Sequence, residues 1–243
     1  MVKLNLPVYN DAGLRALTVL APPLGPADSL MLVSGNVAKA LDLEWLARAH
    51  EQVRAQYPAT RVLYASAGLA HLGALARANV QAAGLVYIYE PGFANVPEFS
   101  WDFGATLANL EHAAALVRGA GLQAVFKPTG RPLLQRALQK HGWHYGRFAE
   151  RVDALFVQTQ TYCQNGTFAE AAEKLAGQCA PYLDKTYVQL TLDLAARNGV
   201  SPAAARTCLT GAERYGFGGM TAWWSPKFAA EVGAFLGSLT SQT

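Results

Sequence analysis

Residues 84–90 read GLVYIYE, a short run of apolar, β-branched and aromatic side chains that ends in one carboxylate, Glu90. Such a run is typical of a buried strand. An alanine-rich stretch with helical spacing precedes it at residues 68–79, and another helical stretch follows at 104–118. A strand between two helices is the repeating unit of a sheet whose parallel strands are joined by crossover helices.

The same alternation of strand and helix recurs about eight times along the chain. In order, the expected strands are residues 2–9, 29–36, 61–66, 84–90, 122–127, 154–161, 186–193 and 216–224. Helix starts are marked by Asp42, a capping residue, and by Ser201-Pro202 and Ser225-Pro226, which place a proline after an N-cap. The alternation predicts an α/β protein folded as a closed (β/α)8 barrel, or TIM barrel.

Composition indicates one domain over residues 1–243 and sets bounds on the partners. Hydrophobic residues make up 51% of the chain and charged residues 15%, and no composition shift divides it. The net charge of +3 comes from 20 basic and 17 acidic residues without a basic run, so no nucleic-acid partner is expected. Because no run of about 18 apolar residues occurs, no membrane partner is expected either. The oligomeric state cannot be predicted from these features.

The cysteines and the amino terminus predict a cytoplasmic protein. Cys163, Cys179 and Cys208 lack the CxxC or Cys/His spacing of a zinc site or a disulfide framework. We therefore expect free thiols in a reducing compartment. Residues 1–11, MVKLNLPVYND, also lack the basic segment, apolar core and cleavage site of a signal peptide.

In a (β/α)8 barrel the active site lies at the carboxyl ends of the strands. Glu90, Lys127 and Asp193 each end a predicted strand, and these three residues are the catalytic candidates. A carboxylate that ends an apolar strand is costly to desolvate unless it has a partner or a raised pKa. Glu90 is therefore the first candidate for general acid/base catalysis, and the alternative is a carboxylate that only orders the following loop.

Other residues at the strand ends suit a ligand with many hydroxyl groups. Amides hydrogen-bond hydroxyls, and an indole ring stacks on the apolar face of a sugar. The candidate binding residues are Tyr9, Asn36, Trp101, Gln158, Gln160, Tyr162, Gln189 and Trp223. Of these, Gln158, Gln160 and Tyr162 are expected on one face of the strand at 154–161, because side chains alternate along a strand. The pattern predicts a small-molecule or oligosaccharide ligand.

The long loop at residues 91–103, PGFANVPEFSWDF, adds Glu98 and Asp102 as further carboxylate candidates. No histidine pair has the HxH or HExxH spacing of a metal site, so no metal is predicted. The glycines follow neither the P-loop nor the GxGxxG pattern, and no cofactor is predicted.

Lys127 permits a second chemistry. A desolvated lysine at a strand end can form a Schiff base with a carbonyl substrate, as in a lyase or aldolase, and Glu90 or Asp193 could then move the proton. A plain ion pair between Lys127 and Glu90 is the structural alternative.

Several strand ends together resemble chitinase-type glycoside hydrolases, a group that includes plant endochitinases and inactive lectin-like relatives. Gln160-Thr161-Tyr162 is similar to the Gln-x-Tyr of that family's sixth strand. Residues 215–226, YGFGGMTAWWSP, resemble the segment in which glycines precede a tryptophan of the sugar-binding floor, here Trp223 or Trp224. The LPVY of residues 6–9 and the GLVYIYE segment also resemble spherulin-type polysaccharide-degrading barrels.

The family's acidic motif, Asp-Gly-x-Asp-x-Asp-x-Glu, is only partly retained. Its glycine and its glutamate match Gly84 and Glu90, but Ala83, Val86 and Ile88 stand where the aspartates belong. In the family, the last aspartate orients the substrate's acetamido group and the glutamate protonates the leaving oxygen. The resemblance therefore implies glycoside hydrolysis by Glu90 with another carboxylate, such as Asp193, Asp102 or Glu98, or a barrel that binds carbohydrate without cleaving it.

Overall fold

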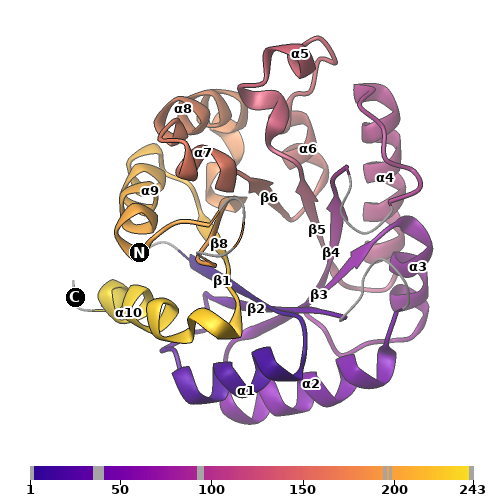
Figure 1. The fold of residues 1–243 in the computed structure, drawn as a ribbon. Helices are drawn as coiled ribbons and strands as arrows, with labels where there is room; N and C mark the ends of the chain where they lie inside the picture. The colour runs from indigo at the N-terminus through magenta and orange to yellow at the C-terminus, as the bar shows by residue number, and fades with distance from the viewer. Residues whose placement is uncertain (1–2, 35–40, 92–95, 194–195, 197–198, 241–243) are drawn as a thin grey trace.

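A computed structural model of the chain describes residues 3–34, 41–91, 96–193, 196 and 199–240. Eight parallel strands close into a barrel in chain order, and the last strand pairs with the first. They are β1 (Lys3–Val8), β2 (Ser29–Val33), β3 (Arg61–Ala67), β4 (Gly84–Tyr89), β5 (Gln123–Pro128), β6 (Ala154–Gln158), β7 (Thr186–Thr191) and β8 (Gly219–Trp223). The predicted (β/α)8 barrel is confirmed (Figure 1).

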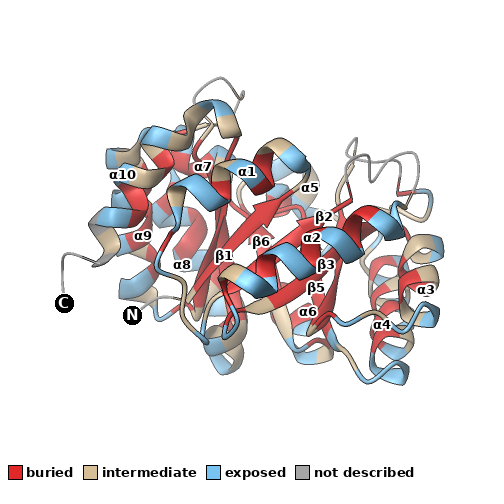
Figure 2. Ribbon diagram, turned by 90° about the horizontal axis from the view of Figure 1, so that it is seen from below, coloured by how far each residue is buried: buried red, intermediate tan, exposed pale blue. Residues whose placement is uncertain are grey.

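Helices surround the barrel (Figure 1). They are α1 (Asp11–Leu20), α2 (Leu43–Gln56), α3 (Leu69–Arg77), α4 (Phe103–Gly119), α5 (Arg136–Gln139), α6 (Tyr145–Arg151), α7 (Gln160–Gln164), α8 (Phe168–Cys179), α9 (Pro202–Tyr215) and α10 (Ala229–Thr240), with short 3-10 helices η1 (Arg131–Leu133), η2 (Ala180–Lys185) and η3 (Pro226–Phe228). Figure 2 shows buried strands at the centre and helices with one exposed side. Among the described helices, none has both the length and the apolar character that a membrane crossing requires.

Capping residues determine where several helices begin. The Asp42 carboxylate accepts a hydrogen bond of 2.8 Å from a backbone N–H in the first turn of α2. The Ser201 hydroxyl accepts one of 3.3 Å at the start of α9, where Pro202 follows in the first turn. These two predicted starts are confirmed. At Ser225-Pro226 the chain first forms the 3-10 helix η3 and then continues into α10.

Side-chain alternation gives each strand an inward and an outward face. The parallel register aligns Val86 of β4 with Ala65 of β3 and Val125 of β5, and it aligns Ile88 with Lys127. These aligned side chains form the inward layers of the barrel. Lys127 therefore follows Val125 on the interior side, nearer to the carboxyl ends of the strands.

The outward face of β4 and β5 carries aromatic rings that pack beneath the helices. The ring centres of Tyr87 and Tyr89 lie 5.8 and 5.7 Å from that of Phe126, which lies 5.3 Å from Phe148 of α6. Burying one side chain of this size stabilises the fold by about 1.5–3 kcal/mol. The prediction that both tyrosines pack under the helices is confirmed, and by alternation Glu90 follows on the inward side.

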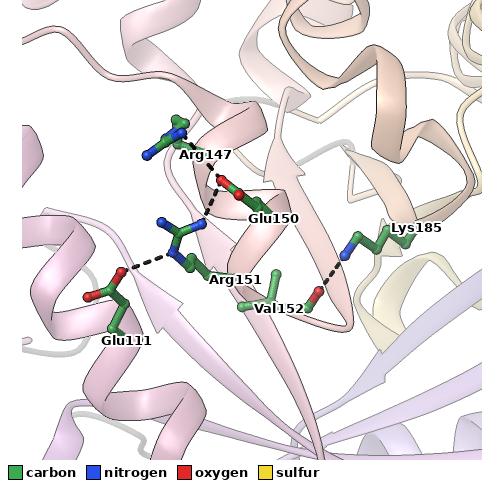
Figure 3. Close-up of polar contacts among 6 residues, drawn as sticks. All are labelled: Glu111, Arg147, Glu150, Arg151, Val152 and Lys185. Atoms are coloured by element: carbon green, nitrogen blue, oxygen red, sulfur yellow. Dashed lines mark hydrogen bonds and ion pairs between the residues drawn. The ribbon is translucent and has the colours of Figure 1, made fainter.

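Ion pairs join helices on the outer surface. Arg151, at the end of α6, pairs with Glu111 of α4 at 3.0 Å and with Glu150 at 2.6 Å (Figure 3). Nearby, the Lys185 ammonium donates a hydrogen bond of 2.7 Å to the Val152 carbonyl. Exposed pairs of this kind contribute little to stability. They cluster just before β6 begins, at the opposite end of the strand from the expected active site.

The sixth strand is shorter than predicted. β6 ends at Gln158, and Thr159 leaves the extended conformation. The Thr159 hydroxyl donates to the Gln189 carbonyl at 2.8 Å and accepts from the Gln189 N–H at 3.1 Å. Because this side chain replaces further backbone pairing with β7, the chain turns into helix α7. The expectation that Gln160 and Tyr162 share a strand face with Gln158 is therefore wrong.

The eighth strand begins later than predicted. Gly216 is left-handed, with φ of 78°, and its N–H closes the end of α9 by donating to the Glu213 carbonyl at 3.0 Å. The strand begins at Gly219, where the Tyr187 ring of β7 occupies the space that a side chain would need. The first glycine of this segment therefore ends a helix, and a later one begins the strand.

The prediction of three free thiols is wrong for two of them. Cys163 of α7 and Cys208 of α9 form a disulfide, with 6.1 Å between their Cα atoms, whereas Cys179 is buried and free. The two cysteines are 45 residues apart, and only the packing of α7 against α9 brings them together. The cysteines therefore no longer support the expectation of a reducing compartment.

Replacing both Cys163 and Cys208 with serine is expected to lower the free energy of unfolding by about 2–4 kcal/mol, because the disulfide restricts the unfolded chain. Urea unfolding of the wild type and the double variant measures the change. Alkylation under denaturing conditions, followed by mass spectrometry, counts the thiols. Labelling of Cys179 alone agrees with the disulfide, whereas three labelled cysteines in protein purified without reductant contradict it.

Candidate active site

A cavity of about 570 Å³ opens at the carboxyl ends of the strands. Its lining in the described chain consists of Tyr9, Val33, Glu90, Pro91, Lys127, Thr129, Arg131, Gln158, Gln160, Thr161, Gln189, Thr191, Asp193, Ala196, Trp223 and Trp224. Most of these residues end a strand or follow one closely, as expected at the mouth of a barrel. The volume falls within the range of small-molecule sites.

The structure brings eight of the predicted site residues together around this cavity. They are Tyr9, Glu90, Lys127, Gln158, Gln160, Gln189, Asp193 and Trp223. They come from strand ends and the segments that follow them in both halves of the chain, and the closure of the barrel makes them neighbours. Their meeting follows from the geometry of parallel strands, while their roles stay predictions.

Three other predicted binding residues are not part of the described lining. The Tyr162 hydroxyl donates a hydrogen bond of 2.9 Å to the Gly130 carbonyl, so this buried side chain braces the turn after β5. Trp101 stacks on His141, with ring centres 6.1 Å apart. Asn36 lies outside the described residues. Tyr162 and Trp101 therefore have structural contacts, and their roles in binding stay predictions.

The two loop carboxylates act as helix caps. Glu98 accepts hydrogen bonds from the first N–H of α3 at 2.6 Å and from the Tyr87 hydroxyl at 2.7 Å. Asp102 accepts one of 2.7 Å from a first-turn N–H of α4. Carboxylates are stabilised at helix amino termini by these N–H groups and by the helix dipole. Glu90 and Asp193 are therefore the acidic side chains of the described cavity lining.

Lys127 is a buried cation at the cavity. Its side chain extends from the end of β5 and is 1% exposed, and its Nζ lies 5.2 Å from the centre of the Trp223 ring. Burial lowers the pKa of Lys127 from 10.5 to about 8, and the negative charge of Glu90 opposes this shift. The expected ion pair with Glu90 does not form, and no other described carboxylate pairs with Lys127.

Three amide atoms of the cavity lining are buried without a hydrogen-bond partner among the described residues. Gln158 Nε2, Gln160 Oε1 and Gln189 Oε1 have no hydrogen bond to the described residues. A buried polar group without a partner costs about 1–3 kcal/mol. The lining thus offers both donors and acceptors to a bound molecule.

Two aromatic rings form one wall of the cavity. The rings of Tyr9 and Trp223 have centres 6.1 Å apart, and the Tyr9 hydroxyl donates to the Trp224 carbonyl at 3.2 Å. The pKa of Tyr9 is raised, first by burial and also by the charge of Asp193, while a hydrogen bond with Ser225 opposes the rise. An apolar wall beside a carboxylate is suited to packing against a sugar ring.

Thr129 and Arg131 line the cavity but are absent from the predicted set. Alternation from Lys127 places Thr129 on the same inward face, so this residue could have been predicted. Arg131 begins η1, and no strand pattern extends to it. Within the described chain, no group of three histidine, cysteine, aspartate or glutamate side chains is placed to hold a metal ion.

No family profile and no curated protein matches the sequence. Among solved structures, the chain is similar to a GH18 chitinase from Pseudoalteromonas aurantia, with a TM-score of 0.67 and 13% identity over 99% of this chain and 100% of the other. It is also similar to a tamarind chitinase-like lectin (TM-score 0.59, 9% identity, 98% of both chains). A third similar structure is the YdjI aldolase from Escherichia coli K12 (TM-score 0.56, 11% identity, 99% of this chain and 89% of the other).

These neighbours share the (β/α)8 fold with the chain, and the predicted resemblance to chitinase-type barrels is confirmed at the level of fold. They include a hydrolase, a lectin and an aldolase. Because one fold hosts such different functions, the chemistry must be argued from the cavity itself.

Lys127→Met is expected to raise the free energy of unfolding at pH 7 by up to about 3 kcal/mol, because the substitution removes a buried ammonium without an ion-pair partner. The pKa of Lys127 is about 8 in the fold against 10.5 as the ordinary value. Between these two pH values the unfolded chain binds more protons, so wild-type stability rises with pH. The advantage of the variant should therefore shrink toward pH 10.

Urea titrations of both proteins at pH 7 and pH 10 measure this difference. Lys140→Met removes an exposed lysine and is the matched control, for which we expect no comparable gain. A Lys127→Met protein that is less stable than the wild type at pH 7 contradicts the expected cost of the buried charge.

Proposed function

We propose that the cavity binds a carbohydrate or a similar polyhydroxylated molecule and that the protein hydrolyses its glycosidic bond. Glu90 is the general acid/base, and Asp193 is the second carboxylate. The observation that carries the proposal is the meeting of two carboxylates, buried amides without partners and an aromatic wall in one cavity.

The binding half of the proposal follows from the unsatisfied amides and the aromatic wall. Hydroxyl groups both donate and accept, so a sugar can supply a donor to Gln160 Oε1 and Gln189 Oε1 and an acceptor to Gln158 Nε2. The rings of Tyr9 and Trp223 can cover the apolar face of the same sugar. A ligand with both kinds of surface uses the whole lining.

The catalytic half uses the two carboxylates in different roles. Glycoside hydrolysis requires one protonated carboxyl to donate to the leaving oxygen and a second, ionised group to act on the other side of the bond. Glu90 follows β4 and Asp193 follows β7, so the two approach the cavity from well-separated strands of the barrel. Water then supplies the hydroxyl of the new reducing end and the proton that restores the acid.

This arrangement differs from the substrate-assisted reaction that the chitinase resemblance implies. The residue that should orient an acetamido group is Ile88, which is buried in the barrel and aligned with Lys127. An aliphatic side chain cannot orient that group. We therefore assign the second carboxylate to Asp193 and expect no requirement for an N-acetyl substituent.

Glu90→Gln is expected to lower the turnover of chromogenic glycosides and labelled oligosaccharides by about 10²–10⁴-fold, because glutamine keeps the shape of the side chain but moves no proton. Sugar affinity should change little. Initial rates and calorimetric binding separate the two effects. Glu173→Gln, an exposed residue of α8, is the control and should match the wild type.

A wild-type protein that binds sugars but turns over none of them contradicts hydrolysis and indicates a carbohydrate-binding barrel. Equal rates for the wild type and Glu90→Gln exclude Glu90 as the acid. Loss of both rate and affinity in the variant indicates that Glu90 holds the ligand and does not transfer a proton.

The buried state of Lys127 favours a second candidate, a lyase or aldolase reaction. With a pKa of about 8, about a tenth of the amine is neutral at pH 7. The neutral amine can attack a carbonyl carbon, the carbonyl oxygen leaves as water, and a carbon–nitrogen double bond remains. Glu90 lies close enough for its charge to act on Lys127 and can move the protons.

Borohydride added with dihydroxyacetone or pyruvate is expected to fix such an intermediate as a secondary amine, and peptide mass spectrometry locates it. The second candidate requires a label on Lys127 that is absent from Lys127→Met. Labelling of surface lysines alone, equal in both proteins, contradicts it.

A further inference from the structure

We propose that the carbohydrate carries a carboxylate, as a uronic acid does, and that Lys127 and the Gln158 amide bind this group on the cavity floor. The inference depends on the proposed function for its sugar ligand and deepens it by naming the substrate class. It concerns binding and does not depend on which residue performs the catalysis.

Lys127 is a cation that needs a counter-ion. It is 1% exposed, and no ion pair with a described carboxylate offsets its burial. The Trp223 ring, 5.2 Å from Nζ, offers a cation–π contact but no negative charge. Glu90 acts on Lys127 as a nearby negative charge but forms no ion pair with it. A ligand anion supplies the ion-pair partner that Lys127 lacks among the described residues.

Gln158 adds a second donor beside Lys127. Its side chain is 7% exposed, and its Nε2 is buried without a described acceptor. The register places Thr129 of β5 next to Gln158 of β6, so Lys127, two residues earlier on β5, is a diagonal neighbour on the same inward face. An ammonium and an amide N–H on diagonally neighbouring inward positions, neither with a hydrogen-bond acceptor among the described residues, suit the two oxygens of a carboxylate.

The described cavity lining contains two cations, Lys127 and Arg131, beside two carboxylates, Glu90 and Asp193. Arg131 is exposed and has no described ion-pair partner, so it can attract the anion toward the cavity.

The test compares binding of matched acidic and neutral sugars to the full chain by calorimetry. The probes are oligogalacturonate and glucuronate-containing disaccharides, each paired with its methyl ester. The wild type is expected to bind the acids about tenfold or more tightly than the esters, the effect of a buried charge-assisted hydrogen bond. In Lys127→Met the ratio should fall close to one. Lys140→Met loses an exposed charge and should keep the wild-type ratio.

The wild type alone gives a second measurement that needs no folded variant. Lys127 loses its proton as the pH rises past 8, so the acid-to-ester ratio should be constant near pH 6–7 and fall above pH 8. Among the residues that the structure describes, the other ionisable groups that line the cavity are Glu90, Asp193, Arg131 and Tyr9. Arg131 stays charged, and the raised pKa of Tyr9 keeps its hydroxyl neutral over this range.

Equal binding of acids and esters by the wild type overturns the inference, as does a preference that survives in Lys127→Met. Tighter binding of glucose 6-phosphate than of glucuronate indicates that Lys127 and Gln158 bind a phosphate group. This result also overturns the inference. A preference for acids without any turnover supports this inference and contradicts hydrolysis. Turnover of neutral glycosides without a charge preference supports hydrolysis and overturns this inference.

Discussion

Closure of eight parallel strands into a barrel is the constraint on which the rest of the structure depends. Once the barrel closes, every second residue of a strand must face the interior, where it either fills the core or lines the cavity at the carboxyl end. On β4 this rule places Val86 and Ile88 in the core and Glu90 at the opening. The outward residues, Tyr87 and Tyr89, hold the strand against the helices. The position of the candidate acid is thus set by packing on both faces of its strand.

The same rule gives Lys127 a position that is unfavourable for stability. A packed core has no place for an ammonium without an anion, and burial lowers the pKa of this group to about 8. Such a residue is hard to explain by folding alone, since an aliphatic side chain would fill the same space. Gln158 Nε2 and Gln189 Oε1 are buried without hydrogen-bond partners among the described residues, and this burial adds to the cost. Several unfavourable buried groups lie at one end of the barrel. Such a grouping is typical of a binding or catalytic site, where residues that serve function lower the stability of the fold.

Features that depend on local pattern could be predicted from the sequence, whereas features that depend on contact between distant segments could not. The barrel, the helix caps and the inward positions of Glu90 and Lys127 follow from alternation and capping residues. The end of β6 depends on a hydroxyl contact between Thr159 and β7, and no pattern in residues 154–161 reveals it. From the sequence alone, Glu98 is a catalytic candidate. In the structure its carboxylate accepts hydrogen bonds from the Tyr87 hydroxyl and from the first N–H of α3.

The partial acidic motif on β4 is weaker evidence against catalysis than it first suggests. Inward positions at one level of neighbouring strands face the same cavity, so a polar group can move from one strand to another and still meet the ligand. Here β4 has aliphatic residues at 86 and 88, while β5, β6 and β7 provide Lys127, Gln158 and Gln189. The polar side chains of this cavity therefore lie on other strands than the aspartates of the chitinase-type motif. The ammonium of Lys127 stands level with Ile88, where that motif has an aspartate, so the same level of the barrel carries a positive charge in place of a negative one.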